Sequence, residues 1–351
     1  MPRARVLCRH VLALLALAAM TGCTWARPTT YPIEPGLSAS FTPSERVASE
    51  AYAEMFCSVL EGEFSANWAS CDTYVKMSSP HQPRPLDAMP AGWTILRIGG
   101  FGAQCVAATA EAFADAGKHL ETHGLTQYHV PVGAFDTSEQ NAERIRDFVV
   151  KLGSGHRFIV VAHSKGAADT MVALTSYPNE LKDVAALITV AGAVGGSHLV
   201  DRLDKLNQDL IGKLGLPSCV VPGKSTGPNA IDSMRRENRQ KFLADHERLK
   251  VSAFSISAVS TKDNTSKILQ GLWDHVAPFA QEQDSHIVER EAIVPGGQFL
   301  GRALGDHWAV AFPFDPNPKV SAGALRVIDK NRFPREALIE AAVRVAVQSL
   351  K

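Results

Sequence analysis

The stretch that decides the fold is FIVVAHSKGAADT, residues 158–170. Its first five residues are apolar and predict a buried strand, and the run that follows predicts a helix from about Lys165 to Ser176. A strand that turns directly into a helix exposes the hydroxyl of the serine between them, here Ser164. Such a turn leaves no room for large side chains two positions to either side, where Ala162 and Gly166 stand. The stretch therefore predicts a strand–turn–helix site with Ser164 as nucleophile.

Strands and helices alternate from residue 91 onward. The predicted strands are 93–98, 128–132, 158–162, 186–191, 251–259 and 291–294. The predicted helices are 104–120, 138–151 and 165–176, the second with a capping-type start at Thr137 or Ser138. This alternation predicts the α/β class, with a mostly parallel central sheet and helices on both faces.

Residues 197–248 interrupt the alternation with a leucine-rich segment, a Gly/Pro/Ser patch at 215–228 and a second helical segment. A long, partly helical insertion between strands is often functional. We expect a cap or lid here, and a plain peripheral helix pair is the alternative.

The strand–serine–helix pattern resembles the α/β-hydrolase fold, in particular its lipase and esterase branch, over residues 91–351. The resemblance implies the chain order Ser, acid, His. Serine needs a base, because its hydroxyl is a poor nucleophile at neutral pH. His307, in LGDHWAVAF, is similar to the segments that carry this base and follows the predicted last strand. His286 and His275 compete with it, but both precede that strand.

The family order places the acid after strand 251–259, where Asp263, Asp274 and Asp284 qualify. Asp284, in QDSHIV, resembles the Asp-Gly-x-Val turn of relatives and is our prediction. It would hold the imidazole in the required tautomer. We expect Asp306 to shape the loop beside His307.

The resemblance also implies an oxyanion hole. One donor would be the amide after the nucleophile, that of Lys165. The second would come from the Gly99–Gly102 turn, which is similar to the His-Gly-x-Gly segment of lipases, with Gly99 where His is usual. The amide of Phe101 is the predicted donor, and that of Gly102 is the next candidate.

The N-terminus resembles a bacterial lipoprotein signal, with a basic start, an apolar run at 11–19 and MTGC at 20–23. This predicts a signal peptide over 1–22, lipidation of Cys23 and a location in the cell envelope. Thr24 is not the Asp that favours retention at the inner membrane, which points to the outer membrane. A plain signal peptide with an incidental Cys is the alternative.

Further boundaries follow from composition. The Pro-rich segment 23–45 is expected to be a tether, residues 46–90 an N-terminal extension, and residues 91–351 the hydrolase domain. The four remaining cysteines are Cys57, Cys71, Cys105 and Cys219. An even number in an exported chain suggests two disulfides. Three pairings are possible, and we prefer Cys57–Cys71 with Cys105–Cys219.

Composition limits the partners. Lys plus Arg and Asp plus Glu are both 36, so the formal net charge is zero and no nucleic-acid partner is expected. The chain contains no HExxH, CxxC or phosphate-loop motif, so no metal or nucleotide cofactor is expected.

Together these patterns predict an exported, lipid-anchored serine hydrolase that cleaves carboxylic esters of small molecules or lipids through an acyl-enzyme. An acyltransferase or thioesterase with the same triad is the enzymatic alternative. A non-catalytic surface-binding lipoprotein is the alternative from another class.

Overall fold

The computed structural model describes residues 43–77, 80–82, 84–103, 110–202, 229–245 and 249–350. The chain divides into two units, 1–36 and 37–351, and all the described residues lie in the second. No described helix is both long enough and apolar enough to cross a membrane.

The centre is a sheet of six parallel strands in the order β2-β1-β3-β4-β5-β6. Its strands are β1 (Thr94–Ile98), β2 (Thr126–His129), β3 (Phe158–His163), β4 (Val184–Val190), β5 (Ser252–Ala258) and β6 (Gln298–Ala303). A parallel sheet must be covered on both faces, which explains the apolar runs of its inner strands. The predicted fold class is confirmed.

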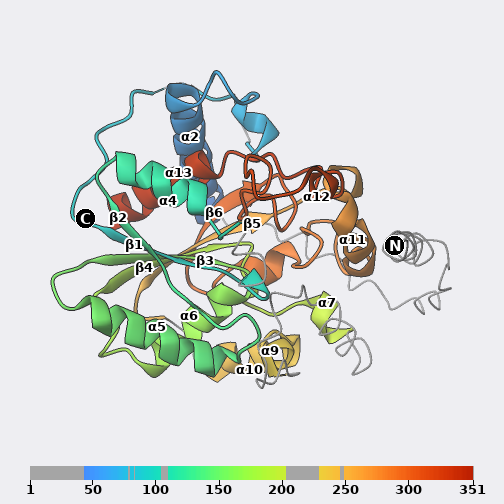
Figure 1. The fold of residues 1–351 in the computed structure, drawn as a ribbon. Coiled ribbons are helices and arrows are strands. Elements are labelled where there is room, and N and C mark those ends of the chain that lie inside the picture. The colour runs from blue at the N-terminus through green and yellow to red at the C-terminus, as the bar shows by residue number, and fades with distance from the viewer. Residues whose placement is uncertain are drawn as a thin grey trace, which may run out of the picture. The chain divides into compact units, whose positions relative to one another are not determined.

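Helices cover both faces of the sheet (Figure 1). One face carries α5 (Ser138–Leu152) and α6 (Lys165–Ser176). The other carries α2 (Pro43–Glu63), α4 (Ala114–Thr122) and α13 (Arg335–Ser349).

The side chains of β3 show how this layering follows from the sequence. Ile159 and Val161 belong to the apolar core under α2, α4 and α13. Phe158 and Val160 belong to the core under α5 and α6. Successive residues of a strand point to opposite faces, so a strand that is apolar throughout supplies both cores at once.

Short helices fill the connections. They are η1 (Cys71–Thr73), α7 (His198–Asp201), α9 (Asn229–Asp232), α10 (Arg236–Asp245), η3 (Lys262–Asn264), η4 (Lys267–Leu269), α11 (Gln270–Val276), η5 (Glu289–Ala292) and α12 (Ala322–Leu325). The expected helix N-cap at Thr137 is present, as a capping box with Gln140 at the start of α5. The predicted insertion contributes α7, α9 and α10, and residues 203–228 lie outside the described part.

The prediction of a strand at 291–294 is wrong. Residues 289–292 form the 3-10 helix η5, and the last strand is β6. Ala292 and Val294 of this segment are buried in the core without joining the ladder, and Glu289 accepts a hydrogen bond from Arg302 Nη2 of β6 at 2.6 Å. Apolar content alone therefore misplaced the strand, since a buried loop has the same composition.

Two other boundaries also differ from prediction. Of the helix expected over 104–120, residues 104–109 lie outside the described part, and α4 begins at Ala114, after Phe113 in a left-handed conformation (φ 57°). The strand expected at 128–132 is β2, which begins two residues earlier than predicted, at Thr126.

The N-terminal extension packs onto the sheet. The Cys57–Cys71 disulfide joins α2 to η1. Val75 then forms an antiparallel bridge with Ala303 at the end of β6. The predicted pair Cys105–Cys219 and the predicted lipid site Cys23 lie outside the described residues.

Candidate active site

Ser164 occupies the turn between β3 and α6 with φ 54° and ψ −126°. A non-glycine residue in this region is strained, and such strain is concentrated at functional sites. The neighbouring small residues are sterically required. A β carbon on Gly166 would lie 2.5 Å from the carbonyl oxygen of Gly99, and one on Gly100 would lie 2.6 Å from Ser164 Cβ. The turn therefore has the geometry of a nucleophile elbow, and it is pressed against the Gly-rich turn after β1.

The elbow lies where the direction of winding reverses. β1 has β2 on one side and β3 on the other, so the connections after β1 and β3 leave toward opposite edges of the sheet. In open α/β sheets, ligands bind at this switch point, outside the carboxyl ends of the strands. The Gly99–Gly102 turn and Ser164 meet there.

The structure brings the three predicted residues into one hydrogen-bonded chain. His307 Nε2 lies 2.9 Å from Ser164 Oγ. His307 Nδ1 lies 2.7 Å from Asp284 Oδ2. Asp284 follows β5 and His307 follows β6, so both arrive at the carboxyl edge that carries the elbow. The exposed fractions are 7% for Ser164, 3% for His307 and 0% for Asp284, so bulk water is largely excluded.

The loop after β5 fixes the Asp284 carboxylate. Its Oδ1 accepts the backbone amides of His286 at 2.9 Å and Ile287 at 2.7 Å, which leaves Oδ2 to face His307. The pKa of Asp284 is raised, because the effect of burial exceeds the opposing effects of the His286 charge and of the two amide hydrogen bonds. Burial likewise lowers the pKa of His307. His307 is therefore neutral at pH 7 and can accept a proton.

The two other aspartates that the chain order allowed as the acid partner of His307 do not lie at the buried site. Asp263 and Asp274 are exposed, and Asp274 pairs with Lys262 Nζ at 2.6 Å. Asp306 is buried and accepts the amides of Ser266, Trp308 and Ala309, at 2.8, 3.0 and 2.9 Å. It shapes the loop that carries the histidine.

Two further histidines enclose His307. The His286 ring stacks on it, with ring centroids 4.3 Å apart and planes 13° apart. His163 Nε2 donates to the carbonyl oxygen of His307 at 3.0 Å. The third histidine considered, His275, lies on α11, and its carbonyl oxygen accepts from Arg202. His286 and His163 thus position the ring that contacts Ser164.

The predicted oxyanion donors lie around the elbow. Lys165 is the first residue of α6, where backbone amides have no acceptor within the helix and the helix dipole favours negative charge. On the opposing turn, the amide of Gly102 donates to the carbonyl of Ala134 at 3.2 Å. The Gly102 amide is therefore already engaged, which favours the Phe101 amide as the second oxyanion donor.

A buried polar network beneath the elbow escaped the sequence analysis. Asp169 accepts from Lys165 Nζ at 2.7 Å, Ser138 Oγ at 2.6 Å and Asn141 Nδ2 at 2.7 Å. Asn141 Oδ1 in turn accepts the amide of Gly133, whose loop holds the Gly-rich turn. The network ties α6 to the loop that holds the Gly-rich turn. Its only sequence signal was a Lys–Asp pair four residues apart, the two charged residues of α6.

The described parts of the insertion adjoin this site. Ser197 Oγ donates to the carbonyl of His286 at 2.7 Å. Apolar side chains of the insertion form a cluster against Phe101; they are Val200, Ile231 and Met234, joined by Ala193, Ile287 and Ala292. An apolar wall therefore lies next to the elbow.

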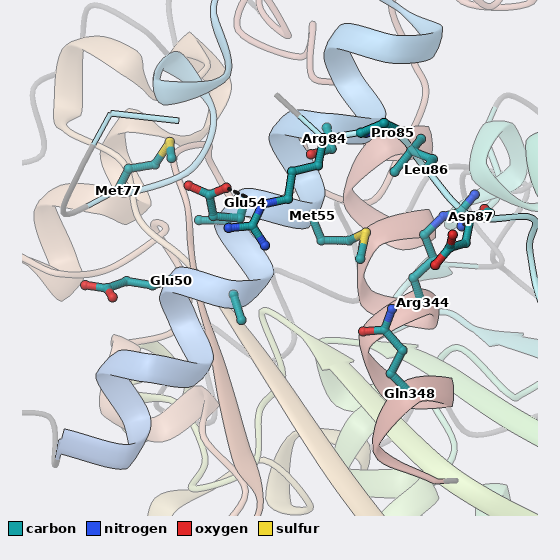
Figure 2. A pocket seen from close by; sticks show the side chains of 13 residues that line it. Glu50, Glu54, Met55, Met77, Arg84, Pro85, Leu86, Asp87, Arg344 and Gln348 are labelled. Carbon is teal, nitrogen blue, oxygen red and sulfur yellow. Dashed lines mark hydrogen bonds and ion pairs between the residues drawn. The ribbon is translucent and has the colours of Figure 1, made fainter. Parts of the chain in front are cut away.

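A separate cavity of about 590 Å³ lies between α2, α13 and the segment 84–87 (Figure 2). In Figure 2, Met55 of α2 points toward Arg344 and Gln348 of α13, whereas Glu54 pairs with Arg84 at 3.9 Å. Ser164, His307 and Asp284 are not among the residues that line it. It is a feature distinct from the elbow.

The sheet, the elbow and the Asp–His–Ser arrangement define an α/β hydrolase. Comparison with solved structures places the chain within that class. It superimposes on a metagenomic carboxyl esterase with a TM-score of 0.77 and 31% identity, over 96% of this chain and 99% of that one. The chain belongs to the same family as that protein.

A more distant neighbour shares only the fold. The mature form of a Bacillus licheniformis lipase matches with a TM-score of 0.51 and 19% identity, over 64% of this chain and 89% of that one. No protein-family model matches the chain, and no curated protein sequence matches it.

Proposed function

We propose that the protein is a serine hydrolase that cleaves carboxylic ester bonds through an acyl-enzyme. The observation that carries this is the continuous hydrogen-bonded chain from Asp284 through His307 to Ser164 at the elbow. Its kinship with a carboxyl esterase supports the choice of an ester over a peptide.

In the proposed mechanism, Ser164 Oγ attacks the ester carbonyl while His307 Nε2 takes its proton. The amides of Lys165 and Phe101 stabilise the oxyanion of the tetrahedral intermediate. The C–O bond of the ester then breaks, and His307 gives the proton to the departing alcohol. Water, deprotonated by His307, repeats the sequence to release the acid. Asp284 holds the imidazole tautomer and stabilises the imidazolium.

The apolar cluster beside Phe101 supports an acyl-binding role for the insertion as a cap. An ester with an apolar acyl group would bury that group against Val200, Ile231 and Met234, at roughly 25 cal/mol per Å² of apolar surface removed from water. The proposed substrates are therefore acyl esters of small molecules or lipids.

The direct test is a panel of p-nitrophenyl esters of rising acyl-chain length, with Ser164→Ala as the variant. Loss of the nucleophile should reduce turnover by a factor on the order of 10⁶. Ser260→Ala is the control, since the hydroxyl of this buried serine bonds Thr265 Oγ1 at 2.7 Å and not a member of the Asp–His–Ser chain. A fluorophosphonate should label Ser164 in the wild type.

Retained hydrolysis or labelling in Ser164→Ala would overturn the mechanism. Faster turnover of thioesters, or transfer of the acyl group to an added alcohol in preference to water, would favour the thioesterase or acyltransferase alternative.

We also propose that the protein is exported and anchored by lipid on Cys23 to the outer membrane, which the lipoprotein-like N-terminal sequence supports. The substitution Cys23→Ser should move the protein from the membrane fraction to the soluble fraction with its esterase activity intact. Finding the unaltered protein in the soluble fraction would contradict the anchor.

A further inference from the structure

Four potential metal ligands from three helices converge away from the active site. Glu63 ends α2, His119 and His123 lie on α4 and at its C-cap, and Glu340 lies on α13. One ligand atom of each lies within 4.8 Å of the others. We call these four residues the helix cluster. The sequence motifs predicted no metal site, and neither histidine belongs to one of those motifs.

The distances within the helix cluster suit a small four-coordinate ion. His119 Nε2 and His123 Nε2 lie 3.6 and 3.2 Å from Glu63 Oε2. His123 Nε2 lies 3.5 Å from Glu340 Oε2. Zinc ligands at about 2.0–2.1 Å in a tetrahedron lie roughly 3.4 Å apart, so these three edges fit. His119 Nε2 and Glu340 Oε2 are 2.5 Å apart and share a hydrogen bond, which an ion would replace.

The local sequence explains why the two imidazoles meet. Residues four apart lie on the same face of a helix, so His119 and His123 present their rings together. The ring centroids are 4.8 Å apart, and His119 also packs against Phe64.

A neighbouring cation orients the buried carboxylate. Arg344 Nε donates to Glu340 Oε1 at 2.7 Å, and Arg344 Nη1 donates to the carbonyl of Asp87 at 2.7 Å. This leaves Oε2, the oxygen that faces both histidines. Hydrogen bonds of this kind fix metal ligands in place. Two carboxylates and one guanidinium leave a formal net charge of −1 beside the two imidazole rings, which favours a cation.

We propose that the helix cluster is a structural zinc site that ties the N-terminal extension to α4 and α13. Two imidazole nitrogens and two carboxylate oxygens are a ligand set that Zn²⁺ accepts, and four protein ligands close the site, as in structural zinc centres. The side chains range from 27% exposed at Glu63 to 0% at Glu340, so an ion can enter from the α2 side.

The test uses the full chain, freed of metal with a chelator and dialysed. Zinc binding is measured by competition with a chromophoric chelator and by elemental analysis, and the melting temperature is followed as Zn²⁺ is added. We expect one ion at the helix cluster, with a rise in melting temperature that saturates with it. His123→Gln should lose that ion and that rise.

Two variants make the result specific. His129→Gln is the matched control, because this histidine is similarly exposed (25%, against 22% for His123) and has Glu111 3.7 Å away. It should behave as the wild type. Arg344→Gln should keep the four ligands but weaken zinc binding by about 10- to 100-fold.

Absence of zinc binding in the wild-type apoprotein would overturn the proposal, as would equal zinc binding in the wild type and His123→Gln. A lower melting temperature in His123→Gln with no zinc-dependent rise in the wild type would identify a plain ion-pair network instead. Zinc bound at the catalytic histidine is recognised separately, because it would persist in His123→Gln and inhibit ester hydrolysis.

Discussion

The active site and the helix cluster both combine imidazoles with carboxylates, but in different arrangements. In the active site, Asp284, His307 and Ser164 form a line in which each member contacts the next, at 2.7 and 2.9 Å. In the helix cluster, His123 Nε2 lies within 3.5 Å of both carboxylates, and the four ligand atoms lie within 4.8 Å of one another.

The difference teaches how arrangement selects chemistry. A line of hydrogen bonds moves a proton in one direction, because each imidazole nitrogen has its own partner. Ligand atoms that converge on one point instead favour a shared cation, whose charge offsets the repulsion of the carboxylates. The supporting bonds differ accordingly, with two backbone amides on Asp284 and the guanidinium of Arg344 on Glu340.

The strongest test of this contrast replaces one carboxylate in each site by its amide. Asp284→Asn should lower turnover by about 10⁴-fold, because the wrong imidazole tautomer then faces Ser164. Glu340→Gln should leave turnover per folded molecule near that of the wild type. Ester hydrolysis by both variants and by the exposed control Asp263→Asn, with folding checked by circular dichroism, measures this. A larger loss of turnover in Asp263→Asn than in Asp284→Asn would show that Asp284 is not the acid that orients His307.

A second test concerns the tight packing behind the nucleophile. Gly100→Ala places a β carbon 2.6 Å from Ser164 Cβ, so the Gly-rich turn must move and the oxyanion amide with it. Loss of one oxyanion donor costs roughly 10²- to 10³-fold in turnover. Gly271→Ala is the control, since no atom lies within 4 Å of the added carbon. Full activity in Gly100→Ala would place the oxyanion donors elsewhere.

A third test asks whether the extension stabilises without taking part in catalysis. Replacing Cys57 and Cys71 together by Ser opens a loop with a sequence separation of 14. The expected loss is about 3 kcal/mol in the free energy of unfolding, measured by denaturant titration. Turnover of the folded variant should be unchanged, since the disulfide lies on α2 and η1. A fall in turnover without a fall in stability would link the extension to the active site.

The smallest effect is a displacement of the pH profile. His307 must be neutral to accept the serine proton, and burial lowers its pKa below the ordinary 6.5. The acidic limb of kcat/KM should therefore lie below pH 6.5, with activity lost as the pH falls through the lowered pKa. His123→Gln should leave this limb in place. A limb at or above pH 6.5 would mean that water reaches the imidazole in solution.

The sequence alone was sufficient for local features of the fold. A strand followed at once by Ser164 and a helix, with Ala162 and Gly166 beside it, specifies the elbow because the steric limits act within a few residues. Apolar periodicity likewise placed β3 and α6, with α6 matching the predicted bounds. The order of Ser164, Asp284 and His307 came from family resemblance.

The tertiary structure alone decided what depends on long-range packing. Segment 291–294 has the composition of a strand, yet it is a buried connection, since the ladder position beside β5 belongs to β6. Asp284 was one of three acids until the fold buried it against His307 and left Asp263 and Asp274 in solvent.

The helix cluster shows this limit most clearly. Its ligands are separated by 56 residues between Glu63 and His119, and by 217 between His123 and Glu340. Only the packing of α2, α4 and α13 on one face of the sheet brings them together. The sequence determines what each segment can form by itself, whereas side chains from distant segments meet only where the burial of apolar faces places their helices side by side.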